Sequence, residues 1–325
     1  MAILIIMIRK DDQNMAVLTA KIYTRSDVEK RYKQNIFHWS DLNKALVNNN
    51  GEEVHFPNFE DAMHFYENSP MISTMQTLAW YHEHAVNHYE KPSVTVDLIG
   101  LRFKHNNLQV MLIKRRSHVE GGKWAFPGGF VNPSEPIVQA CIRETKEETN
   151  VDLHVSQLIR MLPVDTPDRD PRMPWLITNP SIVLFTPKNI DHMKKTAHAG
   201  DDATDLNWFD IQLDENDKLI IDKKAGDLAF DHAKILTDAL IKLKRDFNLP
   251  GMPAITQLLG ENVTTREMLN LYSQVNSRFK NYTASNLSTL YRKYLIKTDK
   301  IMRADTSKGG NSSIVYHWKK RNYKF

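Results

Sequence analysis

The stretch 128–151, GGFVNPSEPIVQACIRETKEETNV, decides how the rest of the chain is interpreted. Pro136 suits the first turn of a helix, because the N–H that it lacks has no partner there. Ser134 precedes it as a candidate N-cap. No glycine or further proline interrupts the run to Thr149. The stretch therefore predicts a helix, and Asn150 stands where helices often end in the left-handed conformation.

Three glutamates of this predicted helix share one face. Glu144 and Glu148 are four residues apart, and Glu147 follows Glu144 by three. Arg143 lies four before Glu147 and can pair with it. Carboxylates at this density repel one another unless a cation neutralises them, and all-oxygen ligands suit Mg²⁺ first and Mn²⁺ next. The face predicts a site where metal-activated water meets a diphosphate. The alternative is a solvated acidic helix face. On the opposite side, three residues are expected to pack inward: Val138, Ile142 and Thr145.

The spacing of these residues resembles the Nudix box, G-x5-E-x7-R-E-U-x-E-E-x-G-U, where U is apolar. Two positions depart from it. Asn150 replaces the final glycine, and Asn is the usual second choice for a left-handed residue. Thr145 occupies an apolar position. The resemblance implies metal binding by Gly129, Glu144, Glu147 and Glu148. It implies a catalytic group made of Arg143, Glu144, Glu147 and Glu148. Glu135 is expected to support the loop that holds Gly128 and Gly129, or to bind a further metal.

Composition limits the class of protein. A length of 325 residues predicts two domains, with a third small element possible. Cys141 is the single cysteine, so an intramolecular disulfide is excluded and a reducing cytoplasm is expected. The opening MAILIIMI is too short for a membrane span and has the wrong flanks for a signal peptide. We expect a strand there, or an upstream extension before a natural start at Met15, and no membrane partner.

Strands and loops surround the predicted helix. The runs 93–102 and 108–115 read as two strands joined by a turn. Another strand is expected over 153–162, one from 174 through 185, and a helix from 228 to about 245. We expect the large aromatic residues of the later part to be core, since such side chains are highly buried on average: Trp208, Phe209 and Phe230.

Four arginines are candidates for binding phosphate. Arg115 and Arg116 end the second strand, and Arg169 and Arg172 lie in the proline-rich loop 165–175. The alternative for the loop arginines is simple solvation on the surface.

Residues 93–245 resemble the ADP-ribose-type Nudix hydrolases. The resemblance is greatest to the group joined to a DNA-binding winged helix, the Nudix-related transcriptional regulators of NAD metabolism. The stretches that carry it are WAFPGGFV (124–131), TPDRDPR (166–172), AGDDA (199–203) with WF (208–209), and LAFDH (228–232). It implies an α+β chain with a Nudix α/β/α sandwich over 93–248. It also implies ADP-ribose or a related NAD-derived diphosphate as ligand, either hydrolysed or only sensed.

Residues 249–325 form a basic segment. From Pro250 onward there are thirteen Lys/Arg against four Asp/Glu, a net +9 in a chain of net +4. Thr264-x-x-Glu267 matches a capping box. The elements expected after this point resemble a winged helix. They are a short helix at 254–259, two longer helices, the second over 285–295, and strands at 296–303 and 313–318. This implies contacts to double-stranded DNA by Asn286, Arg292, Lys293 and Lys308. The alternative is a helical dimerisation module with an ordinary basic surface.

Residues 1–92 predict an N-terminal extension for packing or dimerisation, with helices at 58–66 and 73–88. His82, His84 and His88 match no ligand motif, so surface histidines are favoured over a metal site. Three hypotheses follow for the chain, which we expect to be a homodimer: a Mg²⁺-dependent Nudix pyrophosphohydrolase, an ADP-ribose-sensing DNA-binding regulator, and an adaptor that has lost both activities.

Overall fold

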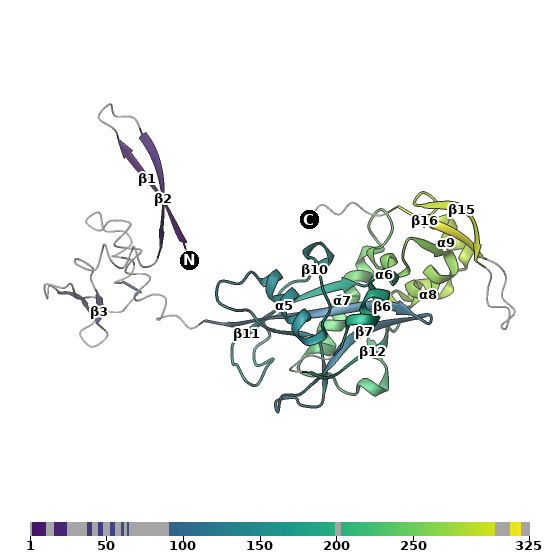
Figure 1. Ribbon diagram of the computed structural model, residues 1–325, viewed down its shortest axis with the longest axis horizontal. Coiled ribbons are helices and arrows are strands. Elements are labelled where there is room, and N and C mark those ends of the chain that lie inside the picture. Colours follow the sequence, from purple (N-terminus) through teal and green to yellow (C-terminus); the bar gives the residue numbers. More distant parts are fainter. Residues whose placement is uncertain are drawn as a thin grey trace. The chain divides into compact units, whose positions relative to one another are not determined.

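The computed structural model describes residues 2–10, 16–24, 38–40, 45–47, 53–55, 60–61, 64, 91–198, 203–302 and 313–319. The chain divides into two compact units, Met1–Lys91 and Pro92–Phe325 (Figure 1).

Within its described residues, the first unit contains two small antiparallel sheets. One pairs β1 (Ala2–Lys10) with β2 (Ala16–Thr24), which confirms the strand predicted for the apolar opening. The other joins β3 (His38–Ser40), β4 (Ala45–Val47) and β5 (Glu53–His55). The helix predicted over 73–88 and its three histidines lie outside the described residues.

The second unit is built on an eight-stranded mixed sheet, in which β11 runs parallel to β6 and the other pairs are antiparallel. Its main path has the order β10-β11-β6-β7-β12-β13, and β8 and β9 pair with β7 and β6. The strands are β6 (Ser93–Lys104), β7 (Asn107–Arg115), β8 (Trp124–Ala125), β9 (Gly128–Phe130), β10 (Leu158–Arg160), β11 (Leu176–Leu184), β12 (Ala203–Leu213) and β13 (Leu219–Ile221). The predicted strand pair at 93–115 is confirmed.

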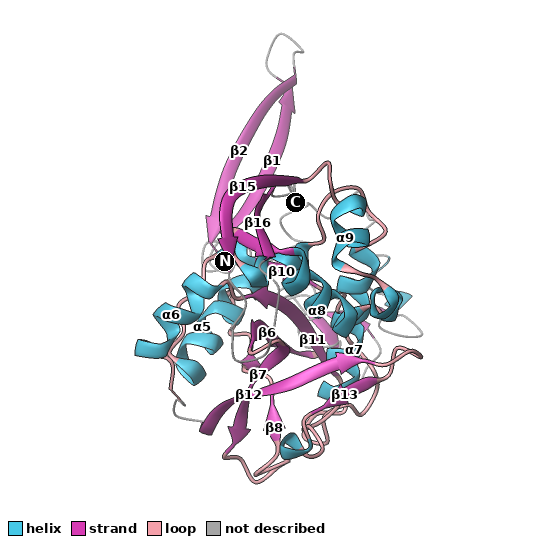
Figure 2. Cartoon of the chain, turned by 90° about the vertical axis from the view of Figure 1, so that its right-hand side faces the viewer, coloured by secondary structure: helices cyan, strands magenta, loops and turns pink. Residues whose placement is uncertain are grey.

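Helices cover both faces of this sheet. Because successive strand residues point to opposite faces, β6 contributes to two cores. Val96 and Leu98 pack with α5 (Ile137–Thr149) and α6 (Pro187–Thr196), whereas Ile99 and Leu101 pack with α7 (His232–Asp246). Figure 2 shows α5 and α6 on one side of β6 and β7, and α7 on the other. The arrangement fits the predicted α/β/α fold.

The predicted helix at 137–149 is present, but its cap differs from the prediction. Ser134 has a left-handed φ of 67° and does not cap the helix. The N-cap is Pro136, whose side chain has no capping atom. The C-terminal prediction is confirmed, because Asn150 has φ 53° and closes the helix through its N–H to the Lys146 carbonyl.

Two boundaries predicted between β9 and α7 were wrong. Residues 153–162 begin with a 3-10 turn, η2 (Val155–Gln157), so the strand β10 is only three residues long. The helix predicted from 228 begins at His232. The residues before it are not helical, because the Ala229 N–H donates to the Trp124 carbonyl of β8 at 2.8 Å instead of to a carbonyl within a helix. Phe230 then adopts φ 52°, which a helix does not allow.

The C-terminal segment combines two helices with a three-stranded sheet of order β14-β16-β15. Its elements are η4 (Ala254–Leu259), β14 (Asn262–Thr264), α8 (Thr265–Val275), η5 (Ser277–Asn281), α9 (Ala284–Leu290), β15 (Leu295–Met302) and β16 (Ser313–Trp318). The Thr264/Glu267 capping box is confirmed. The second helix is shorter than predicted, because the chain leaves it in a turn at the buried Tyr291. Strand β14 was not predicted.

The C-terminal segment shares a core with the sheet. Phe247, just after α7, lies 4.8 Å from Tyr272 and 5.0 Å from Phe279, measured between ring centroids. The Gln274 side chain accepts from the Leu108 N–H at 2.7 Å and donates to the Asn106 carbonyl at 2.9 Å. One continuous core therefore runs across residue 248, and the domain boundaries stay predictions.

None of the helices within the described ranges combines the length and apolar character that a bilayer span requires.

We predict that Phe247→Ala lowers the free energy of unfolding by about 3–5 kcal/mol, the usual cost of emptying a buried phenylalanine site. Urea denaturation measures it. The control is Ile220→Ala, whose side chain is 46% exposed and should cost less than about 1 kcal/mol. Equal effects of the two substitutions would contradict the shared core.

Candidate functional site

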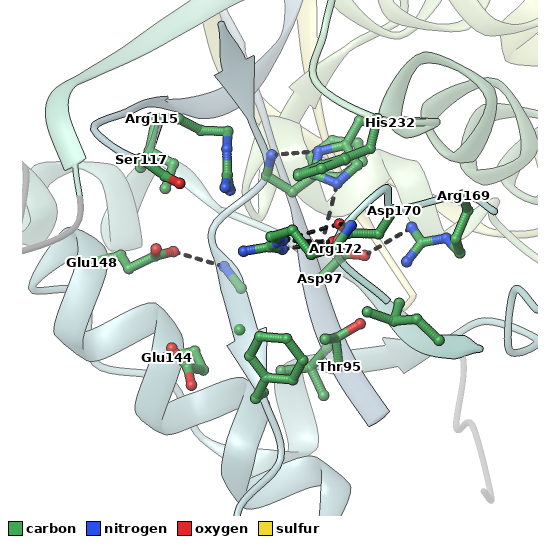
Figure 3. A pocket seen from close by; sticks show the side chains of 18 of the residues that line it. Thr95, Asp97, Arg115, Ser117, Glu144, Glu148, Arg169, Asp170, Arg172 and His232 are labelled. Atoms are coloured by element: carbon green, nitrogen blue, oxygen red, sulfur yellow. Dashed lines mark hydrogen bonds and ion pairs between the residues drawn. The ribbon is translucent and has the colours of Figure 1, made fainter. Parts of the chain in front are cut away.

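A cavity of about 580 Å³ opens beside β9 and α5 (Figure 3). Its polar lining comes from four parts of the chain: β6, the end of β7, α5 with the glycine-containing strand β9, and the 165–175 loop with the start of α7. The lining residues that carry charge are Asp97, Arg115, Arg116, Glu144, Glu148, Arg169, Asp170 and Arg172, with His232 beside them.

Two glutamates of α5 face the glycine strand β9. The Glu148 carboxylate accepts from the Gly128 N–H at 2.7 Å and is buried. The Glu144 carboxylate lies so close to Gly129 that a Cβ at 129 would be 2.5 Å from its Oε2. Glu147 is 57% exposed and does not line the cavity. The predicted face therefore divides into two inward carboxylates and one at the rim.

Arg143 holds this arrangement together. Its guanidinium donates to both oxygens of Glu135 at 2.8 and 2.9 Å, to Glu144 at 2.6 Å and to Glu147 at 3.0 Å. The predicted pair with Glu147 is confirmed. The hydrogen bonds from Arg143 lower the pKa of Glu135 to about 2, and those same bonds raise the pKa of Arg143. Burial raises the pKa of Glu144 despite the arginine.

The donor set of the inward carboxylates fits a hard divalent cation. The side chains that α5 presents to the cavity, Glu144 and Glu148, offer only oxygen atoms as metal ligands. Gly128 and Gly129 of β9 line the cavity beside them and carry no side chain. Burial destabilises the negative charge on Glu144, which a cation would relieve. In the part of the chain that the structure describes, no three His, Cys, Asp or Glu side chains are already grouped as a metal site. The metal roles stay predictions.

The four candidate arginines all line the cavity, but their surroundings differ. Arg115 lies over the Phe230 ring at 4.7 Å, and Arg172 lies over the same ring at 5.4 Å while binding Asp170 at 2.6 Å. Arg116 is exposed. Arg169 is only 5% exposed and donates twice to Asp231, at 2.6 and 3.0 Å. These contacts favour Arg115, Arg116 and Arg172 as phosphate ligands and give Arg169 a structural partner.

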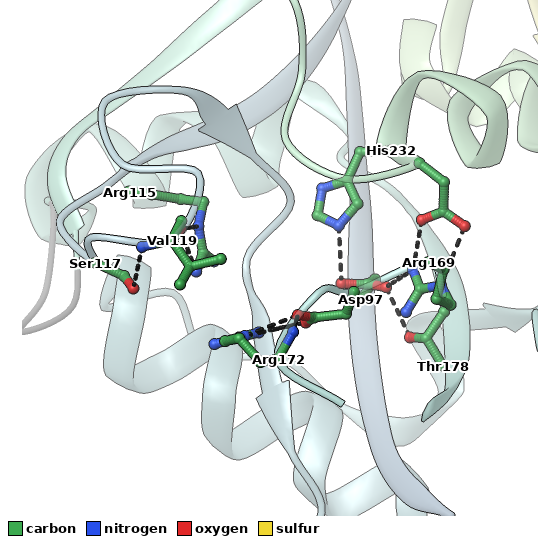
Figure 4. A network of polar contacts seen from close by, with 10 residues as sticks. Asp97, Arg115, Ser117, Val119, Arg169, Arg172, Thr178 and His232 are labelled. Carbon is green, nitrogen blue, oxygen red and sulfur yellow. Dashed lines mark hydrogen bonds and ion pairs between the residues drawn. The ribbon is translucent and has the colours of Figure 1, made fainter. Parts of the chain in front are cut away.

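Sequence reasoning missed a buried polar network on the floor of the cavity (Figure 4). Asp97 accepts from the Thr178 hydroxyl at 2.7 Å, with Arg169 Nη2 at 3.8 Å and His232 Nε2 at 3.6 Å. The Phe126 N–H donates to His232 Nδ1 at 3.0 Å, so the imidazole proton lies on Nε2. Burial lowers the pKa of His232, which keeps it neutral. The signal available in the sequence was a lone Asp within the apolar run 94–101.

One expectation about the aromatic residues was wrong. Phe209 is buried core, as expected, but Phe230 is half-buried and lines the cavity. Phe230 has a left-handed φ, and its ring points away from the core to which the next helix, α7, contributes. Trp208 is partly buried and lies under the Arg102 guanidinium at 4.1 Å.

Three of the four predicted DNA-contacting residues lie in α9 or just after it. Asn286 is exposed, but its side-chain oxygen accepts from the Thr283 N–H and hydroxyl in a capping box of α9. Arg292 and Lys293 are exposed just after α9. Lys308 and its loop lie outside the described residues.

Comparison with known proteins identifies the family. The model of the NUDIX domain matches residues 91–225. An ADP-ribose pyrophosphatase of Methanocaldococcus jannaschii is 36% identical over 150 residues, 46% of this chain and 74% of that protein. The ADPR responsive transcriptional repressor NtrR of Acinetobacter baylyi is 26% identical over 242 residues, 73% of this chain and 86% of that protein.

Solved structures agree on the fold. A MutT/nudix family protein from Enterococcus faecalis superposes with a TM-score of 0.61 at 28% identity, covering 82% of this chain and all of that one. Shewanella oneidensis NrtR complexed with a 27mer DNA gives 0.52 at 22% identity, covering 70% and 93%. The fold is that of a Nudix protein. The chain belongs to the Nudix family, and its resemblance to the ADP-ribose pyrophosphatase and NrtR-like members is confirmed.

We predict that Gly129→Ala and Gly128→Ala separate metal binding from folding. At 129 the three atoms nearest the new Cβ all belong to the end of the flexible Glu144 side chain, so we expect the fold to survive while Glu144 moves. At 128 the Cβ would lie 2.1 Å from the Val96 carbonyl oxygen, which is backbone. Gly129→Ala should abolish the rise in melting temperature caused by Mg²⁺ at little cost in stability. Gly128→Ala should lower stability by about 1–3 kcal/mol, the usual cost of overpacking.

Differential scanning fluorimetry with and without Mg²⁺ measures both effects. A normal Mg²⁺ response in Gly129→Ala would show that Glu144 is not a metal ligand.

Proposed function

We propose that this chain is a divalent-metal-dependent Nudix pyrophosphohydrolase acting on ADP-ribose or a related NAD-derived nucleoside diphosphate. One observation carries the proposal: the inward carboxylates of Glu144 and Glu148 line the same cavity as Arg115 and Arg172. Oxygen ligands for a cation and guanidinium groups for phosphate are what diphosphate hydrolysis needs. The named activity of the Methanocaldococcus jannaschii relative supports ADP-ribose as substrate.

In this proposal Gly129, Glu144 and Glu148 would hold Mg²⁺ or Mn²⁺ from the cavity side, and Glu147 would reach it from the exposed rim. The cation would polarise phosphate oxygens and activate water. Arg143 orients Glu144 and Glu147 through its hydrogen bonds. Arg115 and Arg172 bind the diphosphate, and the Phe230 ring supports both guanidinium groups. A carboxylate of the Glu147–Glu148 pair, or one outside the box, accepts the proton of water.

We predict that Glu148→Gln lowers turnover of ADP-ribose at least about 10²-fold, because it removes a metal ligand and a candidate base together. Release of AMP in the presence of Mg²⁺ measures the rate. The control is Asp152→Asn. Asp152 lies just beyond α5, and its carboxylate is 68% exposed and pairs with Lys146 of that helix. It should retain wild-type turnover. Tight ADP-ribose binding without turnover by the wild type would reject the hydrolase for this substrate.

A second function is favoured by a separate observation. The C-terminal segment combines two helices, a three-stranded sheet and exposed Arg292 and Lys293, and the similarity to the Acinetobacter baylyi repressor extends over 242 residues. We infer a winged helix that binds double-stranded DNA, in a homodimer that responds to ADP-ribose. Both functions can belong to one chain, since the carboxylates are intact.

We predict that the double substitution Arg292→Ala/Lys293→Ala weakens duplex DNA binding and reduces the slope of log affinity against log salt by about 2, one for each lost phosphate contact. Gel shifts at several salt concentrations, with and without ADP-ribose, measure it. The matched control is Lys223→Ala/Lys224→Ala, two exposed lysines of η3 (Lys223–Ala225). Equal loss in both double variants would indicate non-specific charge attraction.

A further inference from the structure

We propose that a joint between α8 and the turn connecting β6 to β7 fixes the C-terminal segment to the Nudix domain. The segment then does not swing on the residues that follow α7, and the two parts move as one body. Pro92–Phe325 already forms one compact unit. The inference goes beyond the proposed hydrolase, and only its consequence for DNA rests on the second proposed function.

The connection between α7 and the C-terminal segment lacks the features of a flexible linker. Linkers that let domains move are exposed and polar, and few contacts cross them. Here Phe247 and Met252 are buried, Met252 with only 1% exposure, and both belong to the core shared with the sheet. The Asp246 carboxylate accepts from the Ala254 N–H, which bridges the two ends of the connection. The connection is therefore part of the folded core.

The turn between β6 and β7 is a tight hairpin. His105 and Asn106 are its central residues, with φ of 52° and 64°, and Lys104 pairs with Asn107 across it. Positive φ at both central positions is typical of the two-residue hairpin turn whose twist matches that of the flanking strands. The Asn106 carbonyl is therefore held in a fixed direction by the turn.

Gln274 of α8 makes the joint with this turn. Its Nε2 donates to the Asn106 carbonyl at 2.9 Å and to the Asn270 carbonyl of its own helix at 2.8 Å. Its Oε1 accepts from the N–H of Leu108, a residue with 0% exposure, at 2.7 Å. The Asn270 side chain donates to the Asn106 side chain at 3.4 Å. Because a buried N–H without an acceptor is costly, movement of α8 away from the turn is disfavoured.

Two further contacts hold the segment at other places. The Phe247 ring, just after α7, packs against Tyr272 and Phe279 at 4.8 and 5.0 Å between ring centroids. At the start of α6, the Pro187 ring lies 3.4 Å from where a Cβ of Gly260 would be. Rotation of the segment about any one of the three contacts breaks at least one of the others. The contacts therefore oppose a hinge motion.

The elements that end at these contacts also reach the cavity. Strand β7 runs from the turn to Arg115, and α7 begins at His232 and ends just before Phe247. A ligand that shifts either element carries the C-terminal segment with it instead of opening a hinge. Under the second proposed function, ADP-ribose then changes DNA binding by displacing one copy of the chain relative to another, as in rigid-body switching of subunits.

Pulsed electron paramagnetic resonance on the full chain tests the joint. Spin labels are attached at Ile220→Cys in β13 and Asp299→Cys in β15, both exposed positions, whereas the native Cys141 is buried. Labelled chains are diluted with unlabelled ones, so that distances within one chain dominate. We expect one narrow distance distribution, whose mean changes by less than about 2 Å when ADP-ribose is added with EDTA or with Mg²⁺.

Amide hydrogen exchange tests the role of Gln274 itself. Gln274→Glu keeps the shape of the side chain and an acceptor for Leu108, but a carboxylate cannot donate to the Asn106 carbonyl. We expect exchange in the β6–β7 turn to become at least about tenfold faster, which corresponds to the loss of one hydrogen bond. The matched control is Gln139→Glu, at an exposed glutamine of α5, and it should leave exchange in the turn unchanged.

Three outcomes would overturn the inference. One is a broad or two-peaked distance distribution in the wild type, and another is a shift of its mean beyond about 2 Å when ADP-ribose is added. The third is unchanged turn exchange in Gln274→Glu, which would show that Gln274 only fills space. If that variant fails to fold, the wild-type distribution decides. A wild type that releases no AMP or binds no DNA rejects a proposed function, while the distribution without ligand still tests the joint.

Discussion

The hydrogen bonds of Arg143 are the interaction on which the functional site depends. One guanidinium joins Glu135, from the loop before α5, to Glu144 and Glu147 on the helix, and it also donates to the Phe130 carbonyl of the glycine strand. Carboxylates this close would repel one another without a shared cation. The Arg143 bond to Phe130 and the Glu148 bond to the Gly128 N–H together join the helix to the strand.

The cavity lies where one face of the sheet changes from apolar to polar. On β6, Ile99 and Leu101 belong to the core under α7, and Asp97 on the same face belongs to the cavity. The start of α7 supplies His232 to this floor, and the chain just after α7 places Phe247 among the aromatic rings of the C-terminal segment. The pocket and the C-terminal segment are thus connected by one helix, α7.

Local patterns predicted the elements whose signals are local. The α5 helix, its left-handed end at Asn150 and the Thr264 capping box depend on contacts within a few residues, and the structure has them. The start of α7 was wrong because a long-range bond between Ala229 and Trp124 overrides helix propensity. The same cause moved Phe230 out of the expected core and into the cavity.

The sequence by itself determined the family, the carboxylate helix and the basic C-terminal segment, because spacing along a helix and net charge are properties of neighbouring residues. Only the tertiary structure decided which charged groups meet. Asp97, Thr178 and His232 are separated by scores of residues and come together because β11 lies beside β6 and α7 starts at the cavity. It also decided that Glu147 faces solvent while Glu148 is buried, since packing against β9 distinguishes adjacent residues of identical chemistry.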